Sequence, residues 1–431
     1  MKIIFDISIL AWSVRSNKAK TGIFRVIENL LNESIHQKDF ELYLSSVQGN
    51  ICSFYEYLEN HNIRIQSDRL LVPRKYSKSK DKVFLLYLWV LNLVDFKRKV
   101  LYKFFIPKII QSILDPLLMI LGMREYLYPI RSEFLNEEFI FHSPYLPFPA
   151  FIKNSKIRKV IFIHDLIPIL YPEFFVSNRD NVVWKIIRDL DSETNIITNS
   201  EFSKLDIIKS IPNINKDRIN VVLLGCDKVF HEVESDFELD KEILKYGLKN
   251  KKYILTVSTL EPRKNLKSSI RAFVRLVEEG LDPEIKFVIL GGRGWGVEFG
   301  TLESEYPDVF KNRIIFLGFI SDEEMALIYS GALFFVYLSL YEGFGLPPLE
   351  AMKSGLPVIV SNTSSLPEVV GEAGVLVDPR DEDEIFLRMK DLVTSRGLRR
   401  KLSLKSRKQA SLFSWEKSVL QLKKIYQNIL K

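Results

Sequence analysis

The sequence is poor in the residues that build metal centres and disulfide frameworks. It has two cysteines, Cys52 and Cys226, and five histidines among 431 residues. The cysteines lie far apart and form no CxxC pattern, so they predict neither a zinc site nor a disulfide scaffold, and they fit a reducing compartment. No DxD motif stands out as a metal clamp. We therefore expect no metal and no cofactor at the functional site.

Long apolar runs are also missing. The longest, at 83–94 and 115–123, are shorter than the roughly 20 residues that a membrane-spanning helix needs. The N-terminal run MKIIFDISIL contains Asp6 and lacks the basic start and cleavage site of a signal peptide. These absences predict a cytoplasmic protein.

The net charge of +7 is concentrated in one segment. Residues 64–108 hold twelve Lys and Arg against three Asp, so the rest of the chain is slightly acidic. This distribution favours a local basic patch over a general polyanion-binding surface, and we see no nucleic-acid-binding module in the sequence. Aromatic residues alternate with the basic ones, which is typical of an element that lies on an anionic membrane surface. The alternative is an insertion that packs into the first domain, and the sequence leaves both open.

Apolar runs that alternate with helical patterns predict two α/β domains. In the second half, strands are expected at 252–260, 285–292, 313–320, 332–340 and 356–362. In the first half, they are expected at 2–8, 40–47, 159–165, 195–200 and 219–225. Continuous apolar strands between helices indicate doubly wound parallel sheets. We expect domains at 1–232 and 243–413, an acidic linker between them, a helical insertion at about 75–135 and a terminal helix at 414–431 that packs back on the first domain.

One stretch, SLYEGFGLPPLEAMKSGLPVIVSN at 339–362, combines features of an anion site. Gly343 and Gly345 permit close backbone approach, and the two prolines that follow suit the first turn of a helix. A helix N-terminus reached through such a loop offers free N–H groups to a phosphate. Glu342 and Glu350 could accept hydrogen bonds from sugar hydroxyls. Taken singly, they could also be a solvated loop acid and a first-turn acid favoured by the helix dipole.

The same stretch resembles the signature of the retaining nucleotide-sugar transferases of glycosyltransferase family 4, which have the GT-B fold. The resemblance includes their pattern of two acids separated by seven residues. It continues in IFIHDLIP, TNSEFSKLDI, VVLLGCD, TVSTLEPRKNL, LGGRGWG, IIFLGFIS and the terminal FSWEKS. At the start of the chain, FDIS and TGIFRVIENL also resemble the family. So many matches in the same order cover most of the chain.

The resemblance implies a role for each matching residue. Glu350 would bind the ribose hydroxyls of a nucleotide diphosphate sugar, and Glu342 would hold hydroxyls of the transferred sugar. Arg263 and Lys264 would neutralise the departing β-phosphate. His164 would reach the donor sugar. Backbone contacts would come from Phe344, Gly345 and Leu346 to sugar and diphosphate, from Gly318 and Phe319 to the base, and from Gly22 near the diphosphate. Arg25 and Asp165 are candidates on the acceptor side.

Some features depart from the family or compete with this interpretation. Many relatives carry a further basic residue near Thr259, so phosphate binding here would depend more on Arg263 and Lys264. GGRGWG, around Trp295, resembles a dinucleotide motif but lacks the ribose acid at the proper distance. The expected activity is retaining transfer of a hexose, mannose or rhamnose, to a glycan or polyprenyl-linked acceptor. Alternatives are a sugar-phosphate synthase, a phosphorylase or an inactive scaffold of the same fold.

Overall fold

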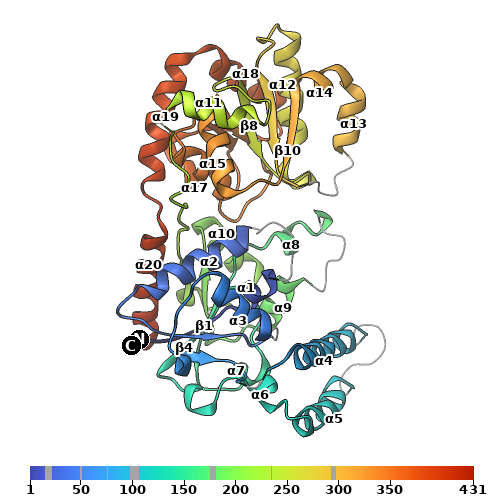
Figure 1. Ribbon diagram of the computed structural model, residues 1–431, viewed down its shortest axis with the longest axis vertical. Helices are drawn as coiled ribbons and strands as arrows, with labels where there is room; N and C mark the ends of the chain where they lie inside the picture. The colour runs from blue at the N-terminus through green and yellow to red at the C-terminus, as the bar shows by residue number, and fades with distance from the viewer. Residues whose placement is uncertain are drawn as a thin grey trace.

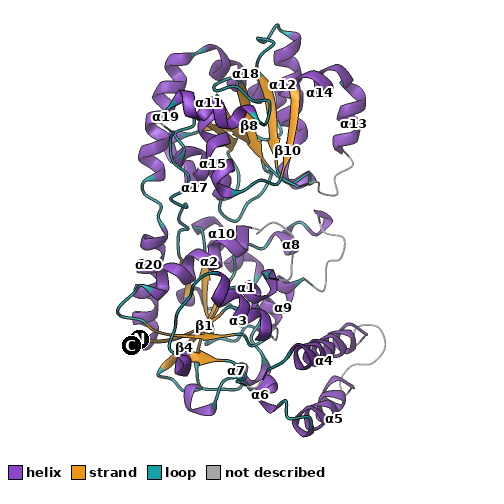
Figure 2. Ribbon diagram, viewed as in Figure 1, coloured by secondary structure: helices purple, strands orange, loops and turns teal. Residues whose placement is uncertain are grey.

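The computed structural model describes residues 1–14, 22–48, 51–74, 76–97, 106–174, 181–233, 235–292 and 298–431, without the side chains of 91–97, 106–111, 298 and 299. These residues form two parallel sheets, one in each half of the chain, with helices on both faces (Figures 1 and 2). The expected doubly wound α/β architecture is therefore confirmed.

The first sheet has seven strands in the order β3-β2-β1-β4-β5-β6-β7. Their bounds are β3 Leu70–Leu71, β2 Glu41–Ser45, β1 Lys2–Asp6, β4 Phe139–Ser143, β5 Arg158–Phe162, β6 Asn195–Thr198 and β7 Ile219–Val221. The strand β4, which was not predicted, pairs with β1 and β5 at the centre of the sheet. The strand is wholly buried, but it is only five residues long, FIFHS. It also comes directly after the helical insertion, so its short apolar run did not stand out as a separate element.

The second sheet has six strands in the order β10-β9-β8-β11-β12-β13. Their bounds are β10 Ile314–Gly318, β9 Lys286–Leu290, β8 Tyr253–Val257, β11 Phe334–Tyr337, β12 Val358–Ser361 and β13 Val375–Val377. Five of these strands lie where the apolar runs predicted them. The sixth, β13, is a three-residue edge strand that we did not predict, because so short a run gives little periodic signal.

Helices cover both sheets. In the first half they are α1 Ser8–Ser13, α2 Gly22–Ile35, α3 Ile51–Asn60, α4 Lys78–Lys97, α5 Ile106–Ile120, α6 Arg124–Leu127, α7 Ala150–Lys153, α8 Ile167–Leu170, α9 Val182–Asp189 and α10 Glu201–Ser210. In the second half they are α11 Asp236–Leu244, α12 Leu266–Glu278, α13 Glu298–Glu305, α14 Pro307–Arg313, α15 Asp322–Gly331, α16 Leu346–Lys353, α17 Leu366–Val370, α18 Glu382–Thr394, α19 Arg396–Ala410 and α20 Trp415–Leu430.

Two of these helices illustrate how local sequence sets the bounds. Ser321 and Glu324 form the capping box that starts α15. The acidic stretch that we expected to be a linker is mostly helical instead. It forms α11, whose N-cap is Ser235, and buries Leu239 and Ile243. The apolar spacing of these two residues gives the acidic helix one buried face.

The insertion is a pair of helices, α4 and α5, that extends away from the first sheet (Figure 1). One side of the pair is packed, since Phe84, Tyr87 and Leu118 are buried. Its other side is exposed and apolar. The exposed large apolar residues on this side and just beyond α5 are Val83, Leu86, Trp89, Ile113, Leu117, Met119, Ile120 and Leu121. The segment thus has one packed side and one exposed side, and its residues 75 and 98–105 lie outside the described part.

No helix in the described part of the chain is long and apolar enough to cross a bilayer.

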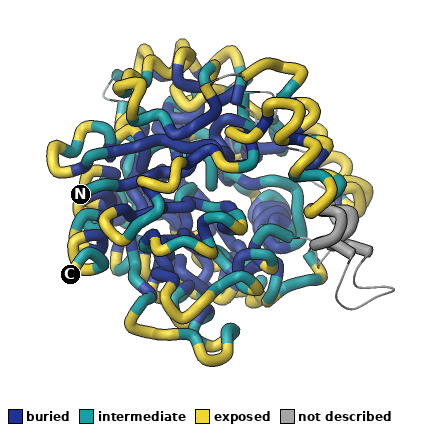
Figure 3. Tube along the Cα trace, turned by 90° about the horizontal axis from the view of Figure 1, so that it is seen from below, coloured by how far each residue is buried: buried dark blue, intermediate teal, exposed yellow. Residues whose placement is uncertain are grey.

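The terminal helix α20 leaves the second half and packs against the first (Figure 1). Its Ser418 Oγ donates to the carbonyl of Leu223 at 2.6 Å. Close packing here requires glycine at position 225, because a Cβ would lie 2.2 Å from the backbone nitrogen of Trp415. Figure 3 shows the buried segments in the interior and the exposed ones at the periphery, with the two ends of the chain on the same side.

Deep in this contact, Tyr426 of α20 meets His142 of β4, with the hydroxyl 2.5 Å from Nδ1. Burial lowers the pKa of His142 to about 3. The unfolded chain protonates this residue near its ordinary pKa of 6.5, whereas the folded chain does so only near pH 3. The unfolded state therefore binds more protons between these values, and His142 costs stability increasingly as pH falls below 6.5.

This titration can be measured by replacing His142 with glutamine, which does not titrate. We expect wild type to lose free energy of unfolding relative to His142→Gln by up to about 1.4 kcal/mol per pH unit between pH 6.5 and 4. Urea unfolding at several pH values measures the difference. Parallel stability curves for the two proteins would contradict a neutral, buried His142.

Candidate active site

The loop after β11 runs from Leu338 to Gly345 and leads into α16. Gly345 has φ +127°, a conformation that favours glycine, and the helix begins with prolines at its first positions. Gly343 has no room for a side chain, because a Cβ would lie 2.5 Å from the carbonyl oxygen of His164. The predicted glycines are therefore needed where this loop approaches the first half of the molecule.

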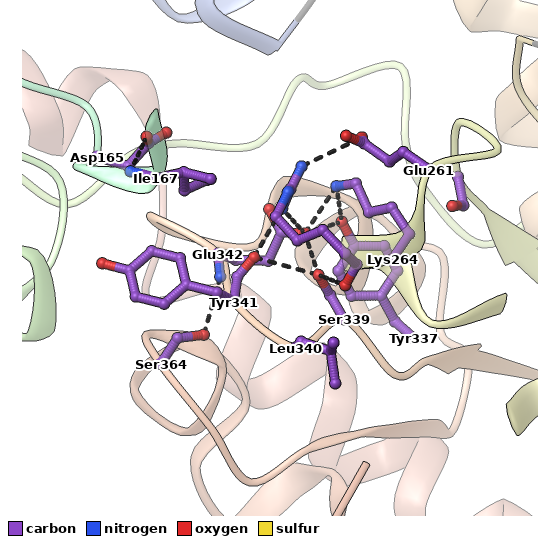
Figure 4. Close-up of polar contacts among 12 residues, drawn as sticks. Asp165, Ile167, Glu261, Lys264, Tyr337, Ser339, Leu340, Tyr341, Glu342 and Ser364 are labelled. Carbon is purple, nitrogen blue, oxygen red and sulfur yellow. Dashed lines mark hydrogen bonds and ion pairs between the residues drawn. The ribbon is translucent and has the colours of Figure 1, made fainter. Parts of the chain in front are cut away.

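Glu342, on this loop, accepts four hydrogen bonds through one carboxylate oxygen (Figure 4). The donors to Oε1 are Arg263 at 2.8 Å, Lys264 at 2.7 Å, the Tyr337 hydroxyl at 2.9 Å and the Ser339 hydroxyl at 2.6 Å. Tyr337 and Ser339 were not among the predicted site residues. Their only signal in the sequence is their place at the end of a buried strand.

The charges in this cluster balance one another. Burial alone would raise the pKa of Glu342, but the two cations outweigh it and hold the pKa at about 2. Burial lowers the pKa of Lys264, and Glu342 opposes that effect. Glu261 adds a second carboxylate, 3.2 Å from Arg263. Two acids thus neutralise two bases, and an incoming anion can recruit the bases from the acids.

A cavity of about 780 Å³ lies beside this cluster and is lined by both halves of the chain. Nine of the predicted site residues line it: Gly22, His164, Asp165, Arg263, Lys264, Glu342, Phe344, Gly345 and Leu346. They come from the C-terminal ends of strands in two different sheets, which is where ligands bind in parallel α/β folds. The structure therefore brings together most of the predicted site.

His164 and Asp165 form part of the wall from the first half. His164 Nε2 lies 2.9 Å from the carbonyl oxygen of Pro144, and its ring stacks on Phe162. Burial lowers the pKa of His164 to about 4, so the ring is neutral at pH 7. Burial raises the pKa of Asp165, whose carboxylate accepts a hydrogen bond from the backbone N–H of Ile167.

Arg25 and Glu350 do not line this cavity but pair with each other across the two halves. Arg25, in α2, lies 2.8 Å from one oxygen of Glu350, in α16, and the Tyr329 hydroxyl donates to the other at 3.1 Å. The Glu350 side chain is only 3% exposed. Burial raises its pKa, and Arg25 works against that rise. Arg25 therefore closes off this carboxylate. A second acid, Asp322, lies 3.8 Å from Nε of Arg25 through its Oδ2.

Gly318 and Phe319 also lie away from the cavity. Gly318 ends β10 with φ +67°, and Phe319 is 64% exposed. The Phe319 ring covers Gly292, where a Cβ would lie 2.6 Å from it. Thr259, in the position where relatives carry a basic residue, donates to Glu261 at 2.7 Å. The expected Trp295 loop falls mostly within 293–297, outside the described residues.

Contacts across the cleft include several that the sequence analysis did not assign. The hydroxyls of Ser200 and Ser203 donate to the carbonyl of Gly343, at 2.8 and 3.2 Å. Glu368 accepts from the first two backbone N–H groups of α10, at 2.9 and 2.6 Å. Tyr341 bonds to Asp206. The TNSEFSKLDI motif was the one available signal, and it identified the segment without its partners.

Comparisons with known proteins agree with this geometry. The family described as "Glycosyl transferases group 1" matches residues 241–409. The O-antigen chain mannosyltransferase B of Escherichia coli is 35% identical over 295 residues, which cover 66% of this chain and 73% of the relative. The serotype-specific mannosyltransferase WbdA of Escherichia coli is 29% identical over 60% of this chain. That match spans 32% of WbdA, so the chain corresponds to about a third of its length.

Solved structures share the whole fold at low sequence identity. Sucrose-phosphate synthase from Thermosynechococcus elongatus has a TM-score of 0.64 and 17% identity, covering 99% of this chain and 98% of that protein. WaaG, a glycosyltransferase involved in lipopolysaccharide biosynthesis, has a TM-score of 0.61 and 15% identity, covering 98% of each chain. With two facing parallel sheets and the relationship to the mannosyltransferase, the chain has the GT-B fold and belongs to the group 1 glycosyl transferases.

Proposed function

We propose that this enzyme transfers a hexosyl group, mannose or rhamnose, from a nucleotide diphosphate sugar to a glycan or polyprenyl-linked acceptor in cell-surface polysaccharide synthesis. The observation that carries the proposal is Glu342, held between Arg263 and Lys264 at the wall of a cavity shared by both halves. The names of the O-antigen mannosyltransferase relatives support a polysaccharide acceptor, and they favour mannose as the transferred sugar.

In the proposed donor complex, the diphosphate recruits Arg263 and Lys264 from Glu342. The carboxylate then turns to hydroxyls of the transferred sugar, which are weaker partners but are held in a fixed position. Backbone N–H groups at 344–346, at the start of α16, face the diphosphate. The ribose takes the place of Arg25 on Glu350, and the base lies along Gly318 and Phe319 at the end of β10.

The proposed reaction retains the anomeric configuration and needs no metal. An acceptor hydroxyl attacks the anomeric carbon on the face from which the diphosphate leaves. The new bond joins the acceptor oxygen to that carbon, the bond from the carbon to the diphosphate oxygen breaks, and the acceptor proton passes to that diphosphate oxygen. The cations of Arg263 and Lys264 stabilise the charge that develops on the leaving group. His164, neutral by its burial, contacts the donor sugar from the opposite wall.

The exposed apolar side of the insertion fits a membrane surface. Ile113, Leu117 and Ile120 are 63%, 51% and 82% exposed and follow one stripe of α5. Leu86 and Trp89 on α4 are each 57% exposed. An element that binds at a membrane interface needs an apolar face and cations for anionic lipid headgroups. These exposed residues supply the apolar face, and the sequence of 64–108 supplies the positive charge. We propose that the enzyme binds the cytoplasmic face of the membrane here, where a lipid-linked acceptor is presented.

The domain boundaries remain part of this proposal. We place the acceptor side in residues 1–232, the donor side in 243–413 and a terminal helix in 414–431. The packing of α20 on the first half supports that last assignment, because Ser418 and Gln421 both bond to Leu223.

The donor and the stereochemistry can be tested together. Wild-type protein is screened for thermal stabilisation by GDP, UDP and dTDP, and the nucleotide that stabilises it then defines the sugar donors to assay. We expect transfer with retention, so that the product has the donor's anomeric configuration by NMR. A product of inverted configuration would contradict the front-face mechanism.

Substitution of the two acids separates their roles. We expect Glu342→Ala to lose at least 100-fold in kcat, because hydroxyl contacts to the transferred sugar are made at the reacting centre. Glu350→Ala should mainly raise the Kd for the nucleotide and change kcat less. Steady-state kinetics and titration calorimetry measure these effects. Near-normal turnover of Glu342→Ala would show that the sugar site is elsewhere.

Membrane binding is tested by co-sedimentation with vesicles that contain phosphatidylglycerol. We expect the triple change Ile113→Ser, Leu117→Ser and Ile120→Ser to reduce the bound fraction about tenfold, because apolar burial contributes roughly 25 cal/mol per Å². The matched control replaces Leu387, Leu404 and Leu412, which are similarly exposed in the second half. Equal losses in both triple variants would contradict a specific role for α5.

A further inference from the structure

Asn199 is a buried carboxamide whose oxygen takes no part in the hydrogen bonds of the described residues. It directly follows β6 at the carboxyl end of the strand, and its side chain is 3% exposed. Its Oδ1 is withdrawn from solvent and has no hydrogen-bond partner among the described residues. Most buried polar atoms in proteins are bonded, and one that is not destabilises the folded state. A ligand group that donates a hydrogen bond to this oxygen would supply the missing partner.

The position of Asn199 shows where that partner comes from. Asn199 lines the same cavity as Glu342 and His164. Among the described residues, only one other buried, unpartnered side-chain atom belongs to a residue of this cavity wall, Nε1 of Trp12. The other atoms of this kind, including Oγ1 of the adjacent Thr198, belong to residues outside the wall. Asn199 therefore belongs to the cavity wall, and its unbonded oxygen lies just beneath the surface of that wall.

The residues around Asn199 place it beside the donor loop. The next residue, Ser200, caps α10 and donates to the carbonyl of Gly343 at 2.8 Å. Gly343 in turn adjoins Glu342 and touches the backbone of His164. Asn199 is thus next in sequence to Ser200, which bonds the two halves together. Asn199 lines the cavity from the first half of the chain, and Glu342 lines it from the second.

The chemistry of an amide selects the ligand group. A carboxamide presents one acceptor oxygen and a donor NH₂, which together match a hydroxyl, itself both donor and acceptor. A phosphate would offer acceptors alone and finds cations at Arg263 and Lys264. An apolar ligand would leave the oxygen unmet. We infer that Asn199 binds a sugar hydroxyl in the cavity, across from Glu342, and thereby helps select the sugar. This inference rests on the proposed glycosyltransferase function.

The hydroxyl can belong to the donor sugar or to the acceptor sugar, and a leucine substitution distinguishes them. Asn199→Leu removes the unmet oxygen, so the melting temperature should stay the same or rise. Affinity for the nucleoside diphosphate alone should also stay within about twofold. Catalytic efficiency should fall at least tenfold, which is the discrimination expected when a polar contact to a hydroxyl is lost.

If the contact is to the donor, Asn199→Leu will weaken binding of the nucleotide sugar and slow its hydrolysis without acceptor. If the contact is to the acceptor, only the acceptor KM will rise. Asn199→Ala serves as a second variant that adds no bulk to the cavity and should lose efficiency in the same way.

The matched control is Asn195→Leu, at the first position of the strand that Asn199 follows. The Asn195 amide is buried and donates to the carbonyl of Lys159, so it serves the fold. This variant should lower the melting temperature and leave KM values unchanged. The inference about Asn199 is overturned if Asn199→Leu lowers the melting temperature as Asn195→Leu does, or if both Asn199 variants keep wild-type efficiency. Absence of any nucleotide-sugar cleavage by the wild type would instead count against the proposed function itself.

Discussion

The carbonyl of Gly343 is the point on which the site depends. It accepts hydrogen bonds from Ser200 and Ser203 of the other half, and it does so at a residue where any side chain would collide with His164. This contact brings the ends of two separate sheets to one cavity. Glu342, the next residue back along the loop, is thereby held opposite the wall that carries His164, so backbone geometry at one glycine determines how the two sets of functional groups face each other.

Charge balance is the second organising feature. Each acid of the signature stretch is paired with a base: Glu342 with Arg263 and Lys264, and Glu350 with Arg25. Buried charges without partners are costly, so these pairs stabilise the site. The proposed donor would bring its own negative charge and hydroxyls, and it could exchange partners with these pairs. The site is therefore neutral as a whole, yet it holds cations that an anion can recruit.

Much of this could be predicted from the sequence, for identifiable reasons. Gly345 and the prolines after it determine a helix start by local geometry alone, and the apolar runs of the second half are long enough to mark five of its strands. The features that were not predicted are contacts between residues far apart in the sequence and strands too short to give a clear pattern. The strand β4 gave five residues of signal, and the partners of Arg25, Ser200 and Glu368 lie more than 140 residues away along the chain. Asn199 was visible only as one letter of a motif, because an unmet hydrogen bond exists only in three dimensions.

The packing of Gly225 against Trp415 has a mechanical consequence. The chain passes between its halves twice, once after β7 and once before α20, and these two crossings touch at this pair. Two adjacent connections define a line about which one half can rotate relative to the other, whereas rotation about other directions would stretch one connection or compress the other. A rotation that widens the cavity is thus confined to a pivot at Gly225 and Trp415, where glycine permits the two passages to lie in contact.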